Sequence, residues 1–322
     1  MKAIVYTKYG GPKMLHLQET PTPSPKKDEV LIRVEAASIN DWDLGLVEGD
    51  LVNRVINGLV KPKRQIVGSD IAGIVETTGA GVTRFKVGDA VYGDLSGRWG
   101  GFAEYVCASE TCLALKPASM SFVDAAAIPQ AAMLAVQAII DVGQLQAGQK
   151  LLINGAGGGV GSFGIQLAKL HGVKTTGVDH TSKLAFMRSI GFDHVIDYTK
   201  EDFTKNGQQY DLIVDAKTNR SMFAYTKSLV AGGKYVTVGG SMKHLLQLML
   251  LRSWISKVHH IHLCLVSLKT NRDLPYINEL FEAGKIKPNI HGTYRLENFR
   301  EAFHLFAAGQ HKGKVVITMH EH

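Results

Sequence analysis

The first part of the chain, up to about residue 115, consists of short apolar segments separated by turn-forming clusters. The segments are rich in β-branched and aromatic residues, and Gly- and Pro-rich turns divide them, which is typical of short strands. The predicted strands cover residues 3–6, 30–38, 71–78, 89–94 and 103–108. We therefore expect an irregular β-barrel or β-sandwich in this part of the chain.

The pattern changes after this β-rich part. An Ala-rich helical stretch over about residues 121–142 is followed, from Lys150 on, by apolar strands and helices in alternation. Such alternation predicts a doubly wound parallel sheet. Two amphipathic helices at 275–284 and 297–309 and a strand at 314–319 end the chain. The predicted fold class is α/β, with a β-rich domain beside the parallel sheet.

Composition and charge narrow the class of protein. Hydrophobic residues make up 45% and charged residues 20% of the 322 residues, as in ordinary globular proteins. The net charge is +7, but no block of five like charges occurs, so we expect no nucleic-acid partner.

Cysteine usage and the apolar segments bear on location. Three cysteines cannot form a disulfide framework, and the start MKAIVYTKYG lacks an apolar signal core, so a cytoplasmic location is expected. The longest uncharged run, 151–168, contains six glycines, and the apolar segment 244–268 is interrupted by charged residues. Neither predicts a membrane span.

The segment LLINGAGGGVGSFGIQLAKLHG carries the strongest local motif. A strand runs into Ala156, Gly158 and Gly161, with the spacing A-x-G-x-x-G, and then into an apolar-periodic helix. Small residues at these positions allow a tight turn, close approach of a pyrophosphate to the backbone, and close packing of the helix on the strand. The N–H groups around Gly159 and Val160, together with Gly157, are predicted to hold the phosphates.

Asp179 lies 23 residues after Ala156, at the end of the next strand. A carboxylate there accepts hydrogen bonds from ribose hydroxyls and repels a 2′-phosphate, so Asp179 favours NAD(H). Lys183, His180 and Tyr198 lie nearby and suit a phosphate instead, and a helix cap is a further role for Asp179. The choice between NAD(H) and NADP(H) therefore stays open at this point.

Beyond these local features, the chain as a whole resembles the medium-chain dehydrogenase/reductase superfamily, and within it the zinc-independent quinone oxidoreductase-like group. The resemblance rests on the order and spacing of SINDWD, GSDIAG, VGDAVYG, GGFAEYV, AAIPQAAMLAVQAI, the glycine loop, IGFDHVIDY, YDLIVDA, VAGGKYVTVGG and AGQHKGKVVI. It implies a GroES-like β-barrel catalytic domain, formed by residues 1–122 and 268–322, and a Rossmann dinucleotide-binding domain at 123–267. It also implies a homodimer through the edge of the Rossmann sheet near 255–266, where the alternating apolar residues predict a strand.

The resemblance also bears on metal binding. Zinc-dependent members have Cys near the position of Asn40 and His at that of Ser69, and Asn and Ser are poor zinc ligands. We therefore expect no zinc. The cluster His259, His260 and His262 is expected to lie on the face of a strand rather than to bind metal, and Cys107 and Cys112 are expected to be structural.

The same resemblance nominates further site residues. It places Asn40 near the nicotinamide, as a residue that orients cofactor or substrate, with a turn or backbone-bonding Asn as the alternative. Asp43 of the same motif is expected to be a helix-start residue rather than an acid. Gly239 and Gly240, Leu265 and Lys314 are expected beside the cofactor, with a surface charge as the alternative for Lys314. Trp42 and Trp99 either line an aromatic-substrate pocket or belong to the core. Relatives have Thr where this chain has Leu134, between Met133 and Ala135, so the nicotinamide contacts are expected to differ.

The resulting hypothesis is an NAD(P)H-dependent oxidoreductase that reduces a small-molecule quinone or an α,β-unsaturated carbonyl by hydride transfer. Conjugated acceptors need no metal to polarise them, because positioning and exclusion of water do most of the work. A non-catalytic nucleotide-binding protein of the same fold is the main alternative, and an alcohol or aldehyde oxidoreductase is another.

Overall fold

The computed structural model describes residues 1–240 and 242–320. The chain divides into two compact units, unit 1 with Met1–Ala131 and Thr270–His322, and unit 2 with Ala132–Lys269. The helix α4 (Pro129–Val136) runs across the division at Ala131. The domain boundaries predicted from the sequence lie at 122/123 and 267/268.

Unit 1 is built on one mixed sheet. Its strand order is β14-β15-β3-β4-β5-β7, and β6 pairs with β3. The strands are β3 (Glu29–Ser38), β4 (Asp70–Thr78), β5 (Ala90–Asp94), β6 (Tyr105–Ser109), β7 (Ala114–Leu115), β14 (Ile290–Arg295) and β15 (Lys314–Thr318). A separate hairpin pairs β1 (Lys2–Val5) with β2 (His16–Glu19). The sheet and hairpin confirm the predicted β-rich N-terminal part.

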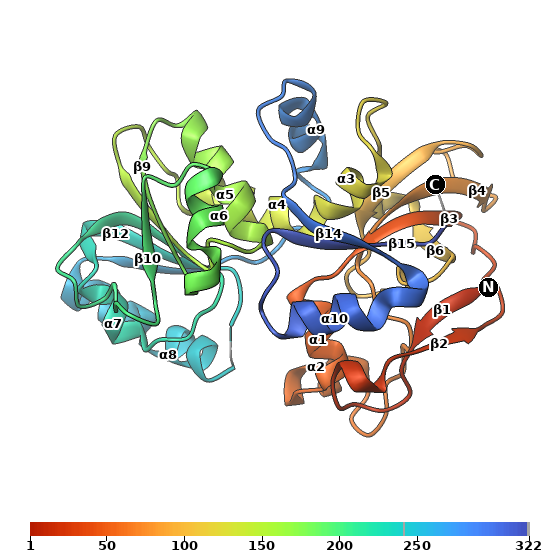
Figure 1. The fold of residues 1–322 in the computed structure, drawn as a ribbon, viewed down its shortest axis with the longest axis horizontal. Helices are drawn as coiled ribbons and strands as arrows, with labels where there is room; N and C mark the ends of the chain where they lie inside the picture. The colour runs from red at the N-terminus through yellow and green to blue at the C-terminus, as the bar shows by residue number, and fades with distance from the viewer. Residues whose placement is uncertain (241, 321–322) are drawn as a thin grey trace. The chain divides into compact units, whose positions relative to one another are not determined.

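Unit 1 also contains short helices. The helices are η1 (Pro12–Met14), α1 (Asp41–Glu48), α2 (Leu51–Asn57), η2 (Glu110–Cys112), α3 (Phe122–Ala127), α9 (Leu274–Glu282), η5 (Leu296–Asn298) and α10 (Phe299–Ala307). α10 packs against β14 and β15 (Figure 1). It buries Phe299, Phe303 and Phe306, whose spacing of four and three residues places them on one helix face.

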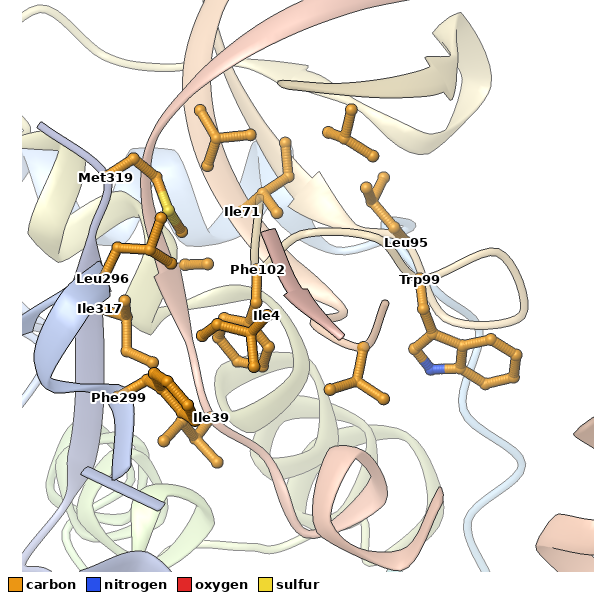
Figure 2. Close-up of a cluster of buried hydrophobic side chains, with 14 of the residues drawn as sticks. Ile4, Ile39, Ile71, Leu95, Trp99, Phe102, Leu296, Phe299, Ile317 and Met319 are labelled. Atoms are coloured by element: carbon orange, nitrogen blue, oxygen red, sulfur yellow. The ribbon is translucent and has the colours of Figure 1, made fainter. Parts of the chain in front are cut away.

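The core of unit 1 joins segments from both ends of the chain. Figure 2 shows Ile4, Ile39 and Phe102 beside Leu296 and Phe299, and Trp99 lies at one side of this cluster. The rings of Phe102 and Phe303 meet edge to face with centroids 5.4 Å apart. The C-terminal strand and helix therefore complete the hydrophobic core of the N-terminal β-rich part.

Unit 2 contains, within its described residues, a six-stranded sheet with the order β10-β9-β8-β11-β12-β13. All its pairings are parallel. In chain order the strands therefore run 3-2-1-4-5-6, which is the dinucleotide-binding arrangement with its reversal between β8 and β11. This confirms the predicted doubly wound parallel sheet.

The elements of unit 2 follow one another as strand and helix. They are η3, a π-helical turn (Gln137–Val142), β8 (Lys150–Asn154), α5 (Gly159–Leu170), β9 (Lys174–Asp179), η4 (Thr181–Lys183), α6 (Leu184–Ser189), β10 (His194–Asp197), β11 (Tyr210–Asp215), α7 (Met222–Thr226), β12 (Leu229–Thr237), α8 (Met242–His259) and β13 (His262–Leu265). The helical stretch predicted over 121–142 is broken at Pro129, because proline lacks an N–H and restricts the residue before it.

The predicted strand over 255–266 was wrong in its first half. Residues up to His259 belong to α8, and only His262–Leu265 form a strand. Leu248 and Ile255 are buried, and Leu251 packs against the same apolar cluster, so the apolar residues follow a helical spacing. The three histidines consequently do not share a strand face, because His259 ends the helix and His260 has φ 53°.

Candidate cofactor site and active-site residues

The glycine loop of unit 2 connects β8 to the N-terminus of α5. Gly155 takes φ +87°, a conformation that favours glycine, and Gly158 is the N-cap residue of α5. A Cβ on Gly158 would lie 3.5 Å from its nearest neighbour, the Gly155 carbonyl oxygen, so no protein atom crowds this position. The free backbone N–H groups at a helix N-terminus suit an anion, which fits the predicted phosphates of a dinucleotide.

Gly161 has the packing role that the motif predicts. A Cβ at this position would lie 2.4 Å from the Ala156 carbonyl oxygen and 2.5 Å from the Ala156 Cα atom. A Cβ atom does not approach a non-bonded atom this closely, so only glycine allows the first turn of α5 to pack against the loop at this distance. Ala156 itself is fully buried. The sequence thus sets the shape of this turn locally.

Asp179 is buried at the carboxyl end of β9, where its carboxylate accepts hydrogen bonds from the loop. The Gly157 N–H donates to Oδ2 at 2.9 Å, and the His180 N–H donates to Oδ1 at 2.8 Å. The alternative role as a helix cap is wrong, since the side chain of His180 caps η4 by accepting from the Ser182 N–H. Asp179 therefore orients the glycine loop.

The structure brings Lys183 and Tyr198 to the same place. The Lys183 ammonium lies 3.7 Å from Oδ1 of Asp179, and both side chains are almost completely buried. The rings of His180 and Tyr198 lie 6.0 Å apart, and both residues are exposed. Asp179 and Lys183 thus form a buried ion pair beside two exposed aromatic side chains.

A second polar cluster lies at the reversal point of the sheet, and the sequence analysis missed it. Asn154, which ends β8, donates from Nδ2 to Oδ1 of Asp215, which ends β11, at 2.8 Å. Tyr225 and Tyr235 both donate to Oδ2 of Asp215. Burial and the adjacent Asp215 raise the pKa of both phenols, which therefore stay protonated as donors. In the sequence, Asp215 at the end of the apolar segment YDLIVDA could have indicated this cluster.

The predicted Gly239 and Gly240 follow β12 and adjoin this cluster. The Thr218 hydroxyl lies 2.6 Å from the Thr237 hydroxyl, and both donate to the Gly239 carbonyl. Gly240 has φ +138°, whereas a Cβ on Gly239 would meet no atom of the described residues within 4 Å. Leu265 ends the edge strand β13 and is 42% exposed.

In unit 1, Lys314 is buried in a cluster of polar side chains from β3, β4 and β15. Its ammonium donates to Oδ1 of Asn40 and, at 3.3 Å, to the Ile39 carbonyl, and it lies 3.5 Å from Oδ2 of Asp70. The alternative of a surface charge is wrong, because Lys314 is 2% exposed. The strand register brings Lys314 close to Asp70. Asp70 on β4 lies opposite Ser38 on β3, and Ser38 lies opposite Val316 on β15.

The side-chain amide of Asn40 is hydrogen-bonded through both its oxygen and its nitrogen. Oδ1 accepts from Lys314, and Nδ2 donates to the Ser69 hydroxyl at 3.1 Å. The Asn40 N–H donates to Oδ2 of Asp43, whose other oxygen accepts from the Gly68 N–H at 3.0 Å. Asp43 lies in the first turn of α1, which confirms its predicted place at a helix start. The amide of Asn40 is thus held in one orientation by partners on both atoms.

Burial shifts the pKa of three carboxyl groups in this region. It raises the pKa of Asp43 to about 7, although two backbone donors oppose the shift. It also raises the pKa of Asp70, against the attraction of Lys314. Asp94 stands opposite Asp70 in the β4–β5 register, and burial together with the Asp70 charge raises its pKa to about 7. One oxygen of Asp94, Oδ2, has no hydrogen-bond partner among the described residues.

A zinc ion does not fit the residues of this cluster. The oxygen atoms of Asn40 and Asp70 contact the Lys314 ammonium, so a cationic group already occupies the centre of the cluster. Asn40 and Ser69 are also poor ligands for zinc. Within residues 1–240 and 242–320 no group of three or more His, Cys, Asp or Glu side chains is arranged to hold a metal. Burial raises the pKa of the Cys107 thiol to about 11, which disfavours the reactive thiolate.

Trp42 and Trp99, the predicted pocket residues, contact each other. Their ring centroids lie 6.3 Å apart, and Trp42 is 39% exposed whereas Trp99 is buried. Trp99 takes φ +55°, which is rare for an aromatic residue, and the Arg64 guanidinium lies over its ring. Its indole N–H is buried and has no hydrogen-bond partner among the described residues. Trp99 is thus a member of the hydrophobic core of unit 1 that also has a strained backbone and an unpaired donor, two features found at ligand sites.

Comparisons with known proteins agree with this geometry. Residues 26–118 match the alcohol dehydrogenase GroES-like domain, and residues 190–317 match the zinc-binding dehydrogenase family. A 2-methylene-furan-3-one reductase from Solanum lycopersicum is 32% identical over 98% of this chain and 79% of that protein. This chain belongs to the quinone-oxidoreductase-like group of the medium-chain dehydrogenase/reductase superfamily.

Two further members of the superfamily support the assignment. An NADPH-dependent alkenal/one oxidoreductase from Arabidopsis thaliana is 32% identical over 98% of this chain and 79% of that protein. The structure of a quinone oxidoreductase from Coxiella burnetii superposes with a TM-score of 0.87 at 28% identity, covering 99% of each chain. The predicted superfamily and the predicted GroES-like plus Rossmann fold are therefore confirmed. Among the described helices of this medium-chain dehydrogenase/reductase, none has the length and apolar character needed to cross a bilayer.

Proposed function

We propose that the protein is a zinc-independent, NAD(P)H-dependent reductase of quinones or α,β-unsaturated carbonyl compounds. Membership of the superfamily supports a nicotinamide cofactor, and relatives named quinone and alkenal/one oxidoreductases support the substrate class. The proposal rests mainly on the Lys314 ammonium, which contacts Asn40 and Asp70 at the centre of the buried cluster of unit 1. This ammonium lies among the polar groups that would otherwise be available to a metal ion. Without a metal to polarise an alcohol, the residues favour acceptors that are already electrophilic.

Unit 2 holds the cofactor in this proposal. The backbone N–H groups of Gly159 and Val160 bind the phosphates at the N-terminus of α5, since the Gly157 N–H donates to Asp179 and the Gly158 N–H to the Gly155 carbonyl. Gly239 and Gly240 let the chain pass close to the dinucleotide. The bound nicotinamide supplies the hydride. The space at Gly158 and Gly239 supports this role, because no side chain within the part of the chain that the structure describes fills either position.

Asp179 leads us to propose NAD(H) as the preferred cofactor. Its carboxylate lies beside Gly157 and repels a 2′-phosphate. Lys183 pairs with that carboxylate and is 3% exposed, so it is poorly placed to serve a phosphate as well. The Arabidopsis relative is named as NADPH-dependent, so both cofactors belong in every assay.

Unit 1 supplies the substrate contacts in this proposal. The unpaired indole N–H of Trp99 donates to a carbonyl oxygen of the quinone or enone, beside the flat surface of Trp42. Asn40, whose amide is held by Lys314, Ser69 and Asp70, has a fixed orientation and positions the acceptor as it is reduced. A proton from solvent then completes the reduction to the hydroquinone or the saturated carbonyl.

We also propose a homodimer that forms through β13. This strand is at the edge of the sheet of unit 2, so its outer N–H and carbonyl groups are available to a second copy. Sedimentation of a single species with the mass of one chain at micromolar concentration would contradict the homodimer. A cytoplasmic location stays a prediction.

The experiment that tests the proposed function is a comparison of acceptors. The purified protein is supplied with NADH or NADPH and a benzoquinone, a naphthoquinone, an alkenal or a saturated aldehyde, and cofactor oxidation is followed by absorbance. We expect turnover with the quinones or the alkenal, none with the saturated aldehyde, and a higher kcat/KM with NADH. Turnover with the saturated aldehyde alone would overturn the proposed substrate class.

A further inference from the structure

The longest helix of unit 2, α8, exposes a continuous apolar face. Leu246, Leu250, Trp254 and Val258 follow one another at intervals of four residues, which places them along one side of the helix. All four are exposed, with Leu250 at 79% and Trp254 at 56%. Exposed apolar patches of this extent are uncommon on proteins that have no partner for them.

The opposite side of α8 accounts for its attachment to unit 2. Leu248 and Ile255 are buried in the apolar cluster beneath the helix. α7 and α8 pack against each other (Figure 1), and Phe223 of α7 meets Trp254 edge to face at 6.1 Å. Phe223 is itself 42% exposed and so extends the apolar face of α8. We call Phe223, Leu246, Met249, Leu250, Trp254 and Val258 the α8 apolar face.

The stretch of sequence that contains α8 has charged residues of one sign only. Between Asp215 and Asp273 the sequence contains no Asp or Glu but nine Lys and Arg residues. Outside this segment acidic residues are slightly in excess, so the whole net charge of +7 arises here. On α8 itself Lys243, Arg252 and Lys257 are exposed. The positive charge is therefore concentrated in the segment that also exposes the apolar face.

We propose that the α8 apolar face seats the protein on the surface of an anionic lipid bilayer. A helix with exposed Leu and Trp side chains on one face and only basic charged residues in its own sequence is suited to lie in the plane of a bilayer, with its apolar side chains at the acyl boundary. Lys243 and Lys257 lie near the two ends of this face, where their long side chains reach anionic headgroups. Because the segment between Asp215 and Asp273 contains basic residues and no Asp or Glu, its charge is complementary to that of an anionic bilayer.

This proposal is independent of the proposed reaction, and its test uses the full chain. Flotation with phosphatidylcholine vesicles, with and without phosphatidylserine, measures binding. We expect the protein to float with the anionic vesicles and not with the neutral ones, and added salt to weaken binding. Leu250→Glu removes an apolar side chain that would enter the bilayer, and the double variant Lys243→Gln/Lys257→Gln removes two contacts to headgroups. Each is expected to reduce the bound fraction about tenfold.

A matched control is available in unit 1. Val87 is an apolar side chain with 62% exposure outside the α8 apolar face, so Val87→Glu is expected to leave vesicle binding unchanged. Circular dichroism and thermal unfolding check that Leu250→Glu folds like the parent chain, as expected for an exposed position. Fluorescence adds a local readout, because the emission of Trp254 is expected to shift to shorter wavelength on anionic vesicles and the Trp254→Phe variant to lose that shift.

Three results would overturn the proposal. The first is a protein that stays unbound with anionic vesicles, and the second is binding that Leu250→Glu and Val87→Glu weaken equally. The third is vesicle binding that Leu250→Glu leaves intact while sedimentation shows that it dissociates a dimer. In that last case the occupant of the α8 apolar face would be a second copy of the chain.

Discussion

The ammonium group of Lys314 lies 3.5 Å from Oδ2 of Asp70, and both side chains are excluded from solvent. The two residues come from strands β15 and β4 and do not pair with each other directly, because β3 lies between their strands. The ion pair therefore links the C-terminal strand to the N-terminal part of unit 1.

Replacing Lys314 tests the strength of this link. Lys314→Met leaves the Asp70 carboxylate and Oδ1 of Asn40 buried without their cation, which is expected to lower the free energy of unfolding by about 3 kcal/mol. Urea unfolding measures the change, with the exposed Lys8→Met as the control. The double variant Lys314→Met/Asp70→Asn removes the uncompensated charge and is expected to recover part of the loss. A Lys314→Met variant as stable as the control would show that the pair contributes nothing.

The raised pKa of Asp94 predicts how stability changes with pH. In the folded protein this carboxyl stays protonated up to about pH 7, whereas in the unfolded chain it ionises near its ordinary pKa of 3.8. Between these values the folded state binds more protons, so stability is greatest at the acidic end of the window and falls as pH rises towards 7. Asp94→Asn cannot ionise and is expected to reduce this slope. The measurement is the unfolding free energy of both proteins from pH 4 to 8, and equal slopes would contradict the assignment.

Two glycines of the same loop are expected to respond differently to alanine. Gly161→Ala puts a Cβ 2.4 Å from the Ala156 carbonyl oxygen, so we expect a loss of about 1–3 kcal/mol in stability and weaker cofactor binding. Gly158→Ala meets no close protein atom, so stability is expected to stay unchanged while cofactor affinity falls about tenfold.

Thermal unfolding and titration with NADH distinguish the two effects. If Gly158→Ala binds NADH like the parent chain, the phosphates do not approach the backbone at this position. The Gly161→Ala variant then serves as the comparison, because it alters the same loop through packing.

Trp99 allows a test of the substrate contact. Trp99→Phe keeps an aromatic ring but removes an indole N–H that has no partner among the described residues, so the chain is expected to fold with a loss of stability from the smaller buried ring. If that N–H donates to the acceptor, kcat/KM for the quinone falls about tenfold, the value of one lost hydrogen bond. Trp254→Phe, which changes an exposed indole, is the control. Unchanged kinetics in Trp99→Phe would remove this residue from the substrate site.

Local features of this protein could be predicted from the sequence, and tertiary ones could not. The strands β3 and β4 start one residue from their predicted positions, and Asp179 was found because its motif lies within one strand–helix–strand unit. The cluster of Lys314, Asn40 and Asp70 joins three distant segments, so its contacts depend on strand order and register. The same limit explains the error at residues 255–259, where burial of Ile255 against the sheet of unit 2 decides in favour of a helix.

Hydride reduction of a conjugated acceptor without a metal is tested by the rate of quinone-dependent NADH oxidation after exhaustive dialysis against EDTA. We predict that the dialysed protein turns over at the rate of the untreated protein and that added zinc does not raise that rate. Loss of activity on dialysis with recovery on addition of zinc would contradict the metal-free site. Bound NADH with no turnover of any acceptor would indicate a nucleotide-binding protein instead.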